Sequence, residues 1–140
     1  MDSYRHLVQY YETDKMGIAH HSNYIRWMAE ARIDFLRQIG WGYDRLEEAG
    51  IISPVTSVEC RYRKPTTFPD EILIKVSILE YNGVFVKLKY LMSRQDGVTV
   101  CEGISEHCFL TRDLKMMRLK KGYPEFHDLL MSLAEEEKTP

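Results

Sequence analysis

The segment formed by residues 11–24, YETDKMGIAHHSNY, concentrates side chains that can take part in acid–base or nucleophilic chemistry. It contains a carboxylate at Asp14, a glycine at Gly17 and adjacent imidazoles at His20 and His21. A carboxylate can attack a carbonyl carbon or activate a water molecule that does so, and an imidazole can carry a proton or orient a neighbour. The same spacing is compatible with an Asx turn at Asp14, a plain turn at Gly17, and histidines whose rings are hydrogen-bonded and have no chemical role.

The residues on either side of this segment predict a connection between a strand and a long helix. Residues 4–12 are rich in tyrosine and are typical of a strand. Ser22 or Asn23 can cap a helix that runs to about Ile39 and stops at Gly40. The first N–H groups of a helix are unpaired and carry positive partial charge, so this helix start is a place where an anion is stabilised.

The helix is apolar along two adjoining stripes, which predicts a wide buried face. One stripe consists of Ile25, Met28, Ala29, Ile33 and Leu36, and the other of Tyr24, Trp27, Ala31 and Phe35. Since a helix of roughly 17 residues is about 25 Å long, a broad layer must cover it.

A series of strands after the helix supplies that layer. A short helical segment at about 43–49 comes first, and the strand-like runs then span about 51–63, 71–81, 84–95 and 98–111. The Asn-Gly pair at 82–83 and the Gln-Asp-Gly triplet at 95–97 predict hairpins, and consecutive hairpins make an antiparallel sheet. Pro65 and Pro69 place a loop between the first two runs.

These elements predict an α+β architecture, in which a strongly curved antiparallel sheet wraps around the long central helix. The exposed face and edges of such a sheet need cover, which favours a homodimer or a larger assembly. A last amphipathic segment begins near Pro124, and the terminal AEEEKTP is expected to be a solvated tail. The apolar side of that segment is formed by Phe126, Leu129, Leu130 and Leu133.

The bulk properties of the chain are ordinary for a globular protein. Its 140 residues predict one domain over residues 1–140, and 44% of them are hydrophobic and 29% charged. The net charge of −2 does not indicate nucleic-acid binding. No apolar run has the length of a signal sequence or a membrane span, so we expect a cytoplasmic protein. Cys60, Cys101 and Cys108 form no C-x-x-C pair and are expected to be buried free thiols rather than metal ligands.

The string YYETDKMGIAHHSNYIRWMAEAR at residues 10–32 closely resembles the opening motif of the hotdog-fold acyl-CoA thioesterases. The similarity is to the 4-hydroxybenzoyl-CoA thioesterase-like family, with the branch associated with the Tol–Pal system most similar, and it continues more loosely through ECRYRKPTTFPDEI at 59–72. The resemblance implies hydrolysis of an acyl-CoA, or of an acyl-carrier-protein thioester, by a homodimer or homotetramer with sites at the protomer interface. It implies no metal and no cofactor, since coenzyme A is part of the substrate and the product.

The resemblance also assigns roles within the motif. Asp14 is implied to be the nucleophile or general base, and the backbone N–H of His21 the oxyanion donor, with the His21 imidazole orienting Asp14 or the thioester. Gly17 would let the loop fold back, and His20 would line the acyl pocket. Asn23, Tyr24 and Trp27 are further candidates for substrate contact, although Asn23 is equally typical of a loop anchor and the two aromatic residues of core packing.

The same family gives two points of comparison outside the catalytic pair. In the hydroxybenzoyl branch a Pro-Ala pair follows the aspartate, whereas this chain has Lys15 and Met16, which weakens the expectation of an aromatic acyl group. Coenzyme A carries phosphates that need basic side chains, and Arg63 and Lys64 are the preferred pair. The basic run at 112–121 is a second candidate, and a solvated surface is the alternative for both.

Other assignments stay open at the level of the sequence. Resemblance to another hotdog branch, whose catalytic acid is a glutamate on the central helix, makes Glu30 a second candidate. The alternative for Glu30 is an ion pair with Arg26 one turn earlier, and Glu12 belongs to the end of the first strand. A hotdog dehydratase or hydratase would use His21 as a base beside a carboxylate. A non-catalytic acyl-CoA sensor would keep the pocket without turnover.

Overall fold

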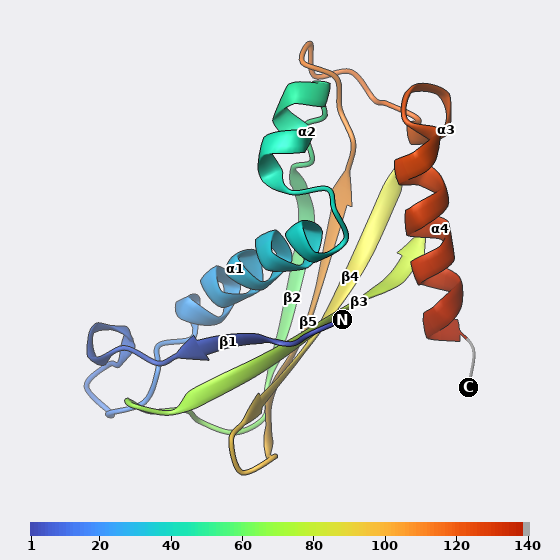
Figure 1. Cartoon of the computed structure of the whole chain (residues 1–140). Coiled ribbons are helices and arrows are strands. Elements are labelled where there is room, and N and C mark those ends of the chain that lie inside the picture. Colours follow the sequence, from blue (N-terminus) through green and yellow to red (C-terminus); the bar gives the residue numbers. More distant parts are fainter. Residues whose placement is uncertain (139–140) are drawn as a thin grey trace.

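The computed structural model describes residues 1–138, and its centre is a five-stranded sheet in the order β1-β3-β4-β5-β2. All neighbouring strands are antiparallel. The strands are β1 (Tyr4–Leu7), β2 (Val55–Tyr62), β3 (Glu71–Tyr81), β4 (Phe85–Arg94) and β5 (Thr99–Cys108). The predicted antiparallel succession of strands is confirmed, and β2 and β1 form the two edges (Figure 1).

Both predicted hairpins are present. The β3–β4 connection turns at Gly83 with φ of 93°, and the β4–β5 connection turns at Gly97 with φ of 85°. Such positive angles favour glycine because it lacks a Cβ. The first strand is shorter than predicted, since it ends at Leu7 and the chain then forms a 3₁₀ turn, η1 (Tyr10–Glu12). The turn forms because the Glu12 side chain accepts a hydrogen bond from the backbone N–H of Gln9.

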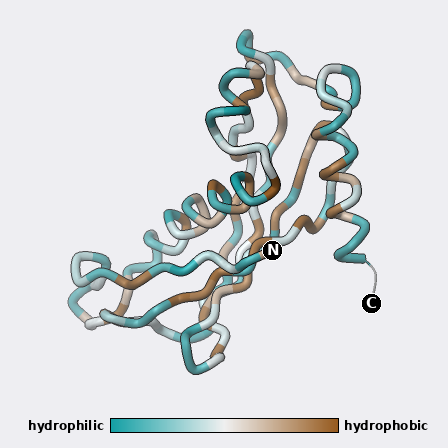
Figure 2. The backbone as a smooth tube through the Cα atoms, in the orientation of Figure 1, coloured by the Kyte–Doolittle hydropathy of each residue, from teal (hydrophilic) through white to brown (hydrophobic). Residues whose placement is uncertain are grey.

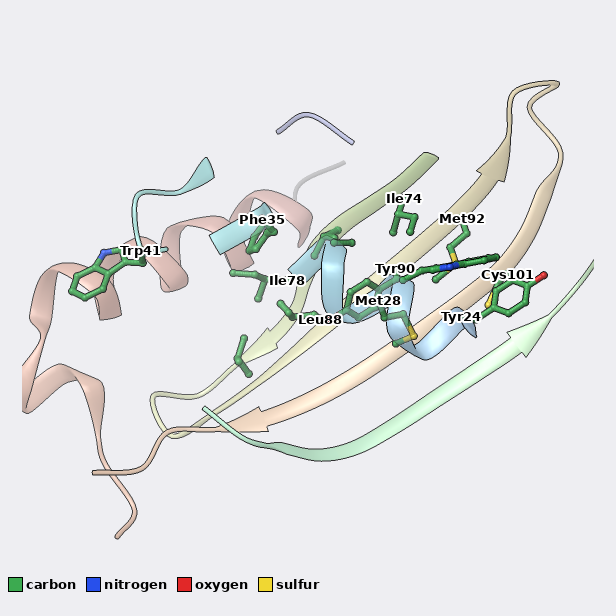
Figure 3. Packing of buried hydrophobic residues seen from close by; sticks show 14 of the residues in the cluster. Tyr24, Met28, Phe35, Trp41, Ile74, Ile78, Leu88, Tyr90, Met92 and Cys101 are labelled. Atoms are coloured by element: carbon green, nitrogen blue, oxygen red, sulfur yellow. The ribbon is translucent and has the colours of Figure 1, made fainter. Parts of the chain in front are cut away.

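Helix α1 (Ser22–Gln38) lies across the inner face of the curved sheet (Figures 1 and 3). Gly40 follows it with φ of 87°, as predicted for a left-handed stop. The prediction of two buried stripes is wrong for Ile25 and Ile33 of the first stripe, which are 45% and 53% exposed, whereas Met28 of the same stripe is buried. The sheet covers only one side of the helix. The buried apolar side chains of α1 are Tyr24, Trp27, Met28, Ala31 and Phe35.

The core lies between α1 and the middle strands. Side chains from β3, β4 and β5 meet those of the helix there, as Figure 3 shows for Met28 and Phe35. In Figure 2, hydrophobic stretches run along the strands while the loop tips are hydrophilic. The core residues labelled on the sheet are Ile74, Ile78, Leu88, Tyr90, Met92 and Cys101. This packing fixes α1, and therefore its N-terminus, against the sheet.

Three further helices complete the fold: α2 (Tyr43–Ala49), α3 (Leu119–Gly122) and α4 (Pro124–Lys138). Helix α2 has its predicted bounds, and α4 packs along β3 with Phe126 buried and stacked 4.4 Å from the ring of Trp41. The predicted tail is instead helical up to Lys138, because Ala134 is buried; residues 139–140 lie outside the described part. Within residues 1–138, no helix is long and apolar enough to cross a bilayer.

Strand β2 is an edge strand with an unusually exposed surface. It pairs only with β5 within residues 1–138, which leaves its other edge without a strand partner. Val55, Val58 and Tyr62 on it are 55%, 42% and 47% exposed. An uncovered edge of eight residues with exposed apolar side chains is a surface that proteins generally pair or cover.

Candidate active site

The loop between η1 and α1 folds back on itself around Asp14. An antiparallel bridge joins Thr13 to Ala19, and the Asp14 N–H donates to the Ile18 carbonyl oxygen at 2.9 Å. The Gly17 N–H donates to the Asp14 carbonyl oxygen at 2.9 Å, and Gly17 has φ of 79°. Gly17 therefore closes the turn that was expected of it, and this turn fixes the backbone of Asp14.

The Asp14 carboxylate is held by one oxygen and free at the other. Its Oδ1 accepts the backbone N–H of Met16 at 2.8 Å, which is the Asx turn that the sequence left as an alternative. Within residues 1–138, Oδ2 has no hydrogen-bond partner. The turn thus orients the carboxylate and leaves one oxygen available for chemistry, so the Asx turn is compatible with a catalytic role of Asp14.

His21 immediately precedes α1 and supplies an unused backbone donor. The N–H groups that follow are bonded, with Asn23 donating to the His20 carbonyl oxygen at 3.0 Å and Tyr24 to the His21 carbonyl oxygen at 3.3 Å. In the described chain, the N–H of His21 itself has no acceptor. Capping by Ser22 or Asn23 was a wrong prediction, since the N-cap residue is His21 and it makes no side-chain cap bond.

A cavity of about 630 Å³ joins the Asp14 carboxylate to the start of α1. Five of the residues singled out from the sequence line it: Asp14, His21, Tyr24, Arg63 and Lys64. Its remaining lining is mostly apolar, from Met16, Ile18, Ala19, Tyr62 and Pro65. The structure therefore brings a carboxylate, a helix N-terminus, an apolar wall and two basic side chains together in one cavity.

Four candidate residues lie outside this lining: Gly17, His20, Asn23 and Trp27. Trp27 is fully buried, and Asn23 is 6% exposed with its side-chain amide bonded to the carbonyl oxygens of Glu12 and His20. His20 is exposed, with Nδ1 2.8 Å from the Ser22 hydroxyl and its ring 4.2 Å from that of His21. Asn23 has the geometry of a loop anchor, which was its alternative role.

Glu12, which the sequence placed at the polar end of the first strand, is instead the centre of a buried hydrogen-bond network. Its buried carboxylate accepts the His6 ring N–H and the Gln9 backbone N–H at 2.8 Å each, and the Trp27 indole N–H at 2.7 Å. Burial raises the pKa of this carboxyl, but the hydrogen bonds outweigh burial and hold the pKa below its ordinary value. Because Glu12 is two residues before Asp14, this network fixes the start of the Asp14 loop to α1.

Tyr62 was also missed, because its contact with the site spans 41 residues of sequence. The Tyr62 hydroxyl donates to the His21 carbonyl oxygen at 3.2 Å, and its ring lies edge-on to Tyr24 at 5.1 Å. Burial, together with the neighbouring Cys60 thiol, raises the pKa of Tyr62 to about 12. The hydroxyl therefore stays a donor at neutral pH and ties the end of β2 to the start of α1.

The two basic residues of the cavity differ in how free they are. Arg63 is paired with Glu102, with Nη2 2.8 Å from the carboxylate oxygen. Within residues 1–138, Lys64 makes no salt bridge. The second basic run lies elsewhere, and its Arg112 guanidinium donates to the carbonyl oxygens of Glu47 and Glu48. Lys64 is thus the more available cation beside Asp14.

Glu30 does not reach the cavity. Its carboxylate lies 3.1 Å from the His6 ring and 3.3 Å from the Tyr4 hydroxyl, on the side of α1 that faces β1. The ion pair with Arg26 expected as its alternative role is not among the contacts of residues 1–138. Glu30 supports the strand–helix contact and is remote from the free carboxylate oxygen of Asp14.

Comparisons with known proteins agree on one family. The profile of the thioesterase-like superfamily matches residues 8–126. A Bacillus subtilis (strain 168) relative, YneP, provisionally named an acyl-CoA thioesterase, is 31% identical over 121 residues, covering 86% of this chain and 88% of the relative. A DHNA-CoA thioesterase structure from Staphylococcus aureus has a TM-score of 0.90 at 30% identity, covering 99% of this chain and 96% of that one. A gentisyl-coenzyme A thioesterase structure has a TM-score of 0.76 at 27% identity, covering 82% and 93%.

Proposed function

Because the chain belongs to the thioesterase-like superfamily and has the hotdog fold of its structural relatives, we propose that it hydrolyses acyl-CoA thioesters at the cavity that contains Asp14. The fold and the enzyme class expected from the sequence are confirmed by these relatives. The observation that carries the assignment of the site is the shared cavity of the free Asp14 oxygen and the unbonded N–H of His21.

The proposed reaction uses these two groups in complementary roles. Asp14 attacks the thioester carbonyl carbon, or removes a proton from a water molecule that attacks it. The carbonyl oxygen becomes an oxyanion, which the His21 N–H and the positive end of α1 stabilise. The carbon–sulfur bond then breaks, and coenzyme A leaves as a thiol once it has taken up a proton. Where Asp14 is the nucleophile, water hydrolyses the resulting anhydride and restores the carboxylate.

The rest of the cavity fits the two ends of an acyl-CoA. Tyr24, Tyr62 and the side chains of Met16 and Ile18 provide apolar surface for an acyl group. Lys64 is a free cation for a phosphate of coenzyme A, with Arg63 beside it. The reaction needs water as its only co-reactant, so no metal or organic cofactor is part of the proposal.

We further propose that two copies pair through the open edge of β2, giving a homodimer that can assemble into a homotetramer. The exposed apolar side chains on β2 support this pairing. An acyl-carrier protein remains an alternative donor of the thioester. A cytoplasmic location is supported by the free thiols of Cys60, Cys101 and Cys108.

Two other functions are less well supported by the geometry. A dehydratase would need the His21 imidazole beside a carboxylate, but within residues 1–138 the ring contacts of His21 are with His20 at 4.2 Å and Tyr62 at 6.2 Å. A non-catalytic sensor would not require a carboxylate with a free oxygen at a helix start. Release of free thiol distinguishes a thioesterase from both alternatives.

The proposal is tested by assaying free thiol release from a panel of acyl-CoAs. The panel should contain short and long aliphatic chains together with DHNA-CoA and gentisyl-CoA, the substrates named for two structural relatives. We expect hydrolysis by the wild-type protein and loss of turnover in Asp14→Asn, with substrate binding retained. Wild-type rates in Asp14→Asn would refute the role of Asp14, and binding without turnover by the wild type would favour the sensor.

A further inference from the structure

A second cavity, of about 500 Å³, lies where α1, α2 and the segment before β2 meet, and it shares no lining residue with the Asp14 cavity. Leu46 and Ile51 on its wall are buried, and Ile52 is 37% exposed. Arg32 and Tyr43 also line it. Its volume is within the range of pockets that hold small organic ligands, about 300–1,000 Å³.

The Arg32 guanidinium in this cavity is a half-buried cation for which residues 1–138 provide no anionic partner. Its Nη2 donates to the Ser53 carbonyl oxygen at 2.9 Å, but within residues 1–138 no carboxylate forms a salt bridge with it. Burial lowers the pKa of Arg32, although a guanidinium stays protonated at neutral pH. Since a partly desolvated charge gains from an opposite charge beside it, the remaining donors of Arg32 favour an incoming anion.

The polar groups behind Arg32 cannot act as that anion. His107 is 1% exposed, and its Nε2 lies 2.7 Å from the Ser105 hydroxyl, which lies 2.8 Å from the Tyr90 hydroxyl. Burial and the Arg32 charge lower the pKa of His107 to about 3, so its ring is neutral. Its Nδ1 has no partner within the described residues. His107 pairs in the sheet with Val55, a lining residue of the cavity, which places this neutral polar chain next to it.

The rim of the cavity adds a second positive charge. Arg112 lines it and is held by bonds of 3.1 and 3.3 Å to the carbonyl oxygens at the end of α2. Glu47 is the acidic residue of the lining, and its side chain is exposed. Arg32 is therefore the charged side chain of the inner part of the cavity, and Arg112 and Glu47 lie at its rim.

We propose that this cavity binds a monocarboxylate with an apolar body, whose carboxylate pairs with Arg32 and whose body packs on Tyr43, Leu46 and Ile52. A guanidinium presents parallel N–H donors that match the two oxygens of a carboxylate. The volume exceeds what a small inorganic anion would fill, and Leu46, Ile51 and Ile52 offer apolar contact to the body of an organic acid. The site does not require Asp14 or any step of thioester hydrolysis, so it stands or falls independently of the proposed reaction.

The probe for this proposal is 2-naphthoate, with 2-naphthamide as a neutral compound of the same shape. Calorimetric titration of the full chain should show binding of the acid, with the amide weaker by about tenfold or more because it cannot form a charge-assisted pair. Arg32→Met should weaken binding of the acid to the level of the amide. Arg45→Gln is the matched control, because Arg45 lies over the Trp41 ring outside this cavity, and it should bind as the wild type does.

Two further variants keep the result interpretable. Ile52→Trp fills the cavity from its partly exposed wall without removing Arg32, and it should abolish binding even if Arg32→Met fails to fold. Asp14→Asn should retain binding, because the carboxylate site is separate. The proposal is overturned if acid and amide bind equally, if Ile52→Trp binds as the wild type does, or if Asp14→Asn abolishes binding and so places the probe at the other cavity.

Discussion

The indole N–H of Trp27 donates to the Glu12 carboxylate at 2.7 Å, so the chain just before Asp14 is fixed to the buried face of α1. The same helix begins at the His21 amide. The Asp14 carboxylate and the proposed oxyanion donor come from the two ends of one loop, and both are thus held to the same rigid helix. The relative position of Asp14 and His21 is set by a buried acid that takes no part in the proposed chemistry.

Glu12→Gln is expected to destabilise the protein by about 1–3 kcal/mol, because the amide NH₂ cannot accept from donors that the carboxylate now satisfies. Thiol release should fall as well, since the loop that carries Asp14 loses its anchor. Urea unfolding and the thioesterase assay measure the two effects. Glu30→Gln is the matched control, because Glu30 also contacts His6 but is exposed. It should change the free energy of unfolding and the rate of thiol release only slightly. Equal losses in both variants would contradict the anchoring role.

His21→Ala is expected to keep most of the activity, whereas His21→Pro should lower kcat by about 10²–10³-fold. Alanine retains the backbone N–H, and proline removes it, while the φ of −56° at this position is compatible with proline. Circular dichroism should show that both variants fold. Comparable kcat values for the two variants would mean that the N–H is not the oxyanion donor. If both values were equally low, the loss would belong to the imidazole, which both variants lack.

Lys64→Ala is expected to raise KM for acyl-CoA by roughly 3–10-fold with kcat little changed, because a phosphate contact binds substrate and transition state alike. The effect should shrink in high salt. An acyl-pantetheine substrate, which lacks the nucleotide, should show no difference between wild type and variant. Lys89→Ala is the control, because Lys89 is exposed on β4 outside the Asp14 cavity. A KM change that persists with acyl-pantetheine would contradict phosphate binding.

His107 predicts a specific dependence of stability on pH. Its pKa is about 3 in the folded protein against an ordinary 6.5, so between these values the unfolded chain binds a proton that the folded chain does not. Stability contributed by the neutral ring is therefore complete above about 6.5 and is lost as pH falls toward 3, with a slope of up to about 1.4 kcal/mol per pH unit. The slope of unfolding free energy against pH should be shallower in His107→Gln. Parallel curves for the two proteins would refute this contribution.

Local patterns in the sequence predicted those parts of the fold that depend on neighbouring residues. The Asn-Gly pair at 82–83, the helix stop at Gly40 and the turn at Gly17 each rest on a backbone angle that glycine adopts easily. The motif around Asp14 and His21 likewise lies within one short segment, and the structure brings both residues to one cavity.

The features that were missed depend on contacts between distant segments. Glu12 looked like the polar end of a strand, but its partner Trp27 lies a helix turn beyond the loop and converts it into a buried acid. Ile25 and Ile33 fit a helical stripe equally well, yet the sheet covers only the neighbouring stripe. Tyr62 approaches His21 only because β2 ends beside α1. Periodicity cannot determine which side of a helix a sheet will cover.

The open edge of β2 has a consequence for how the enzyme behaves on dilution. Tyr62 lies at the end of that strand and its hydroxyl holds the His21 carbonyl, so a partner that pairs with β2 also stiffens the oxyanion site. Under the proposed pairing, specific activity becomes a function of protein concentration and falls below the dissociation constant of the dimer. Turnover per protomer would then report assembly directly, and a single dilution series would give the strength of the interface.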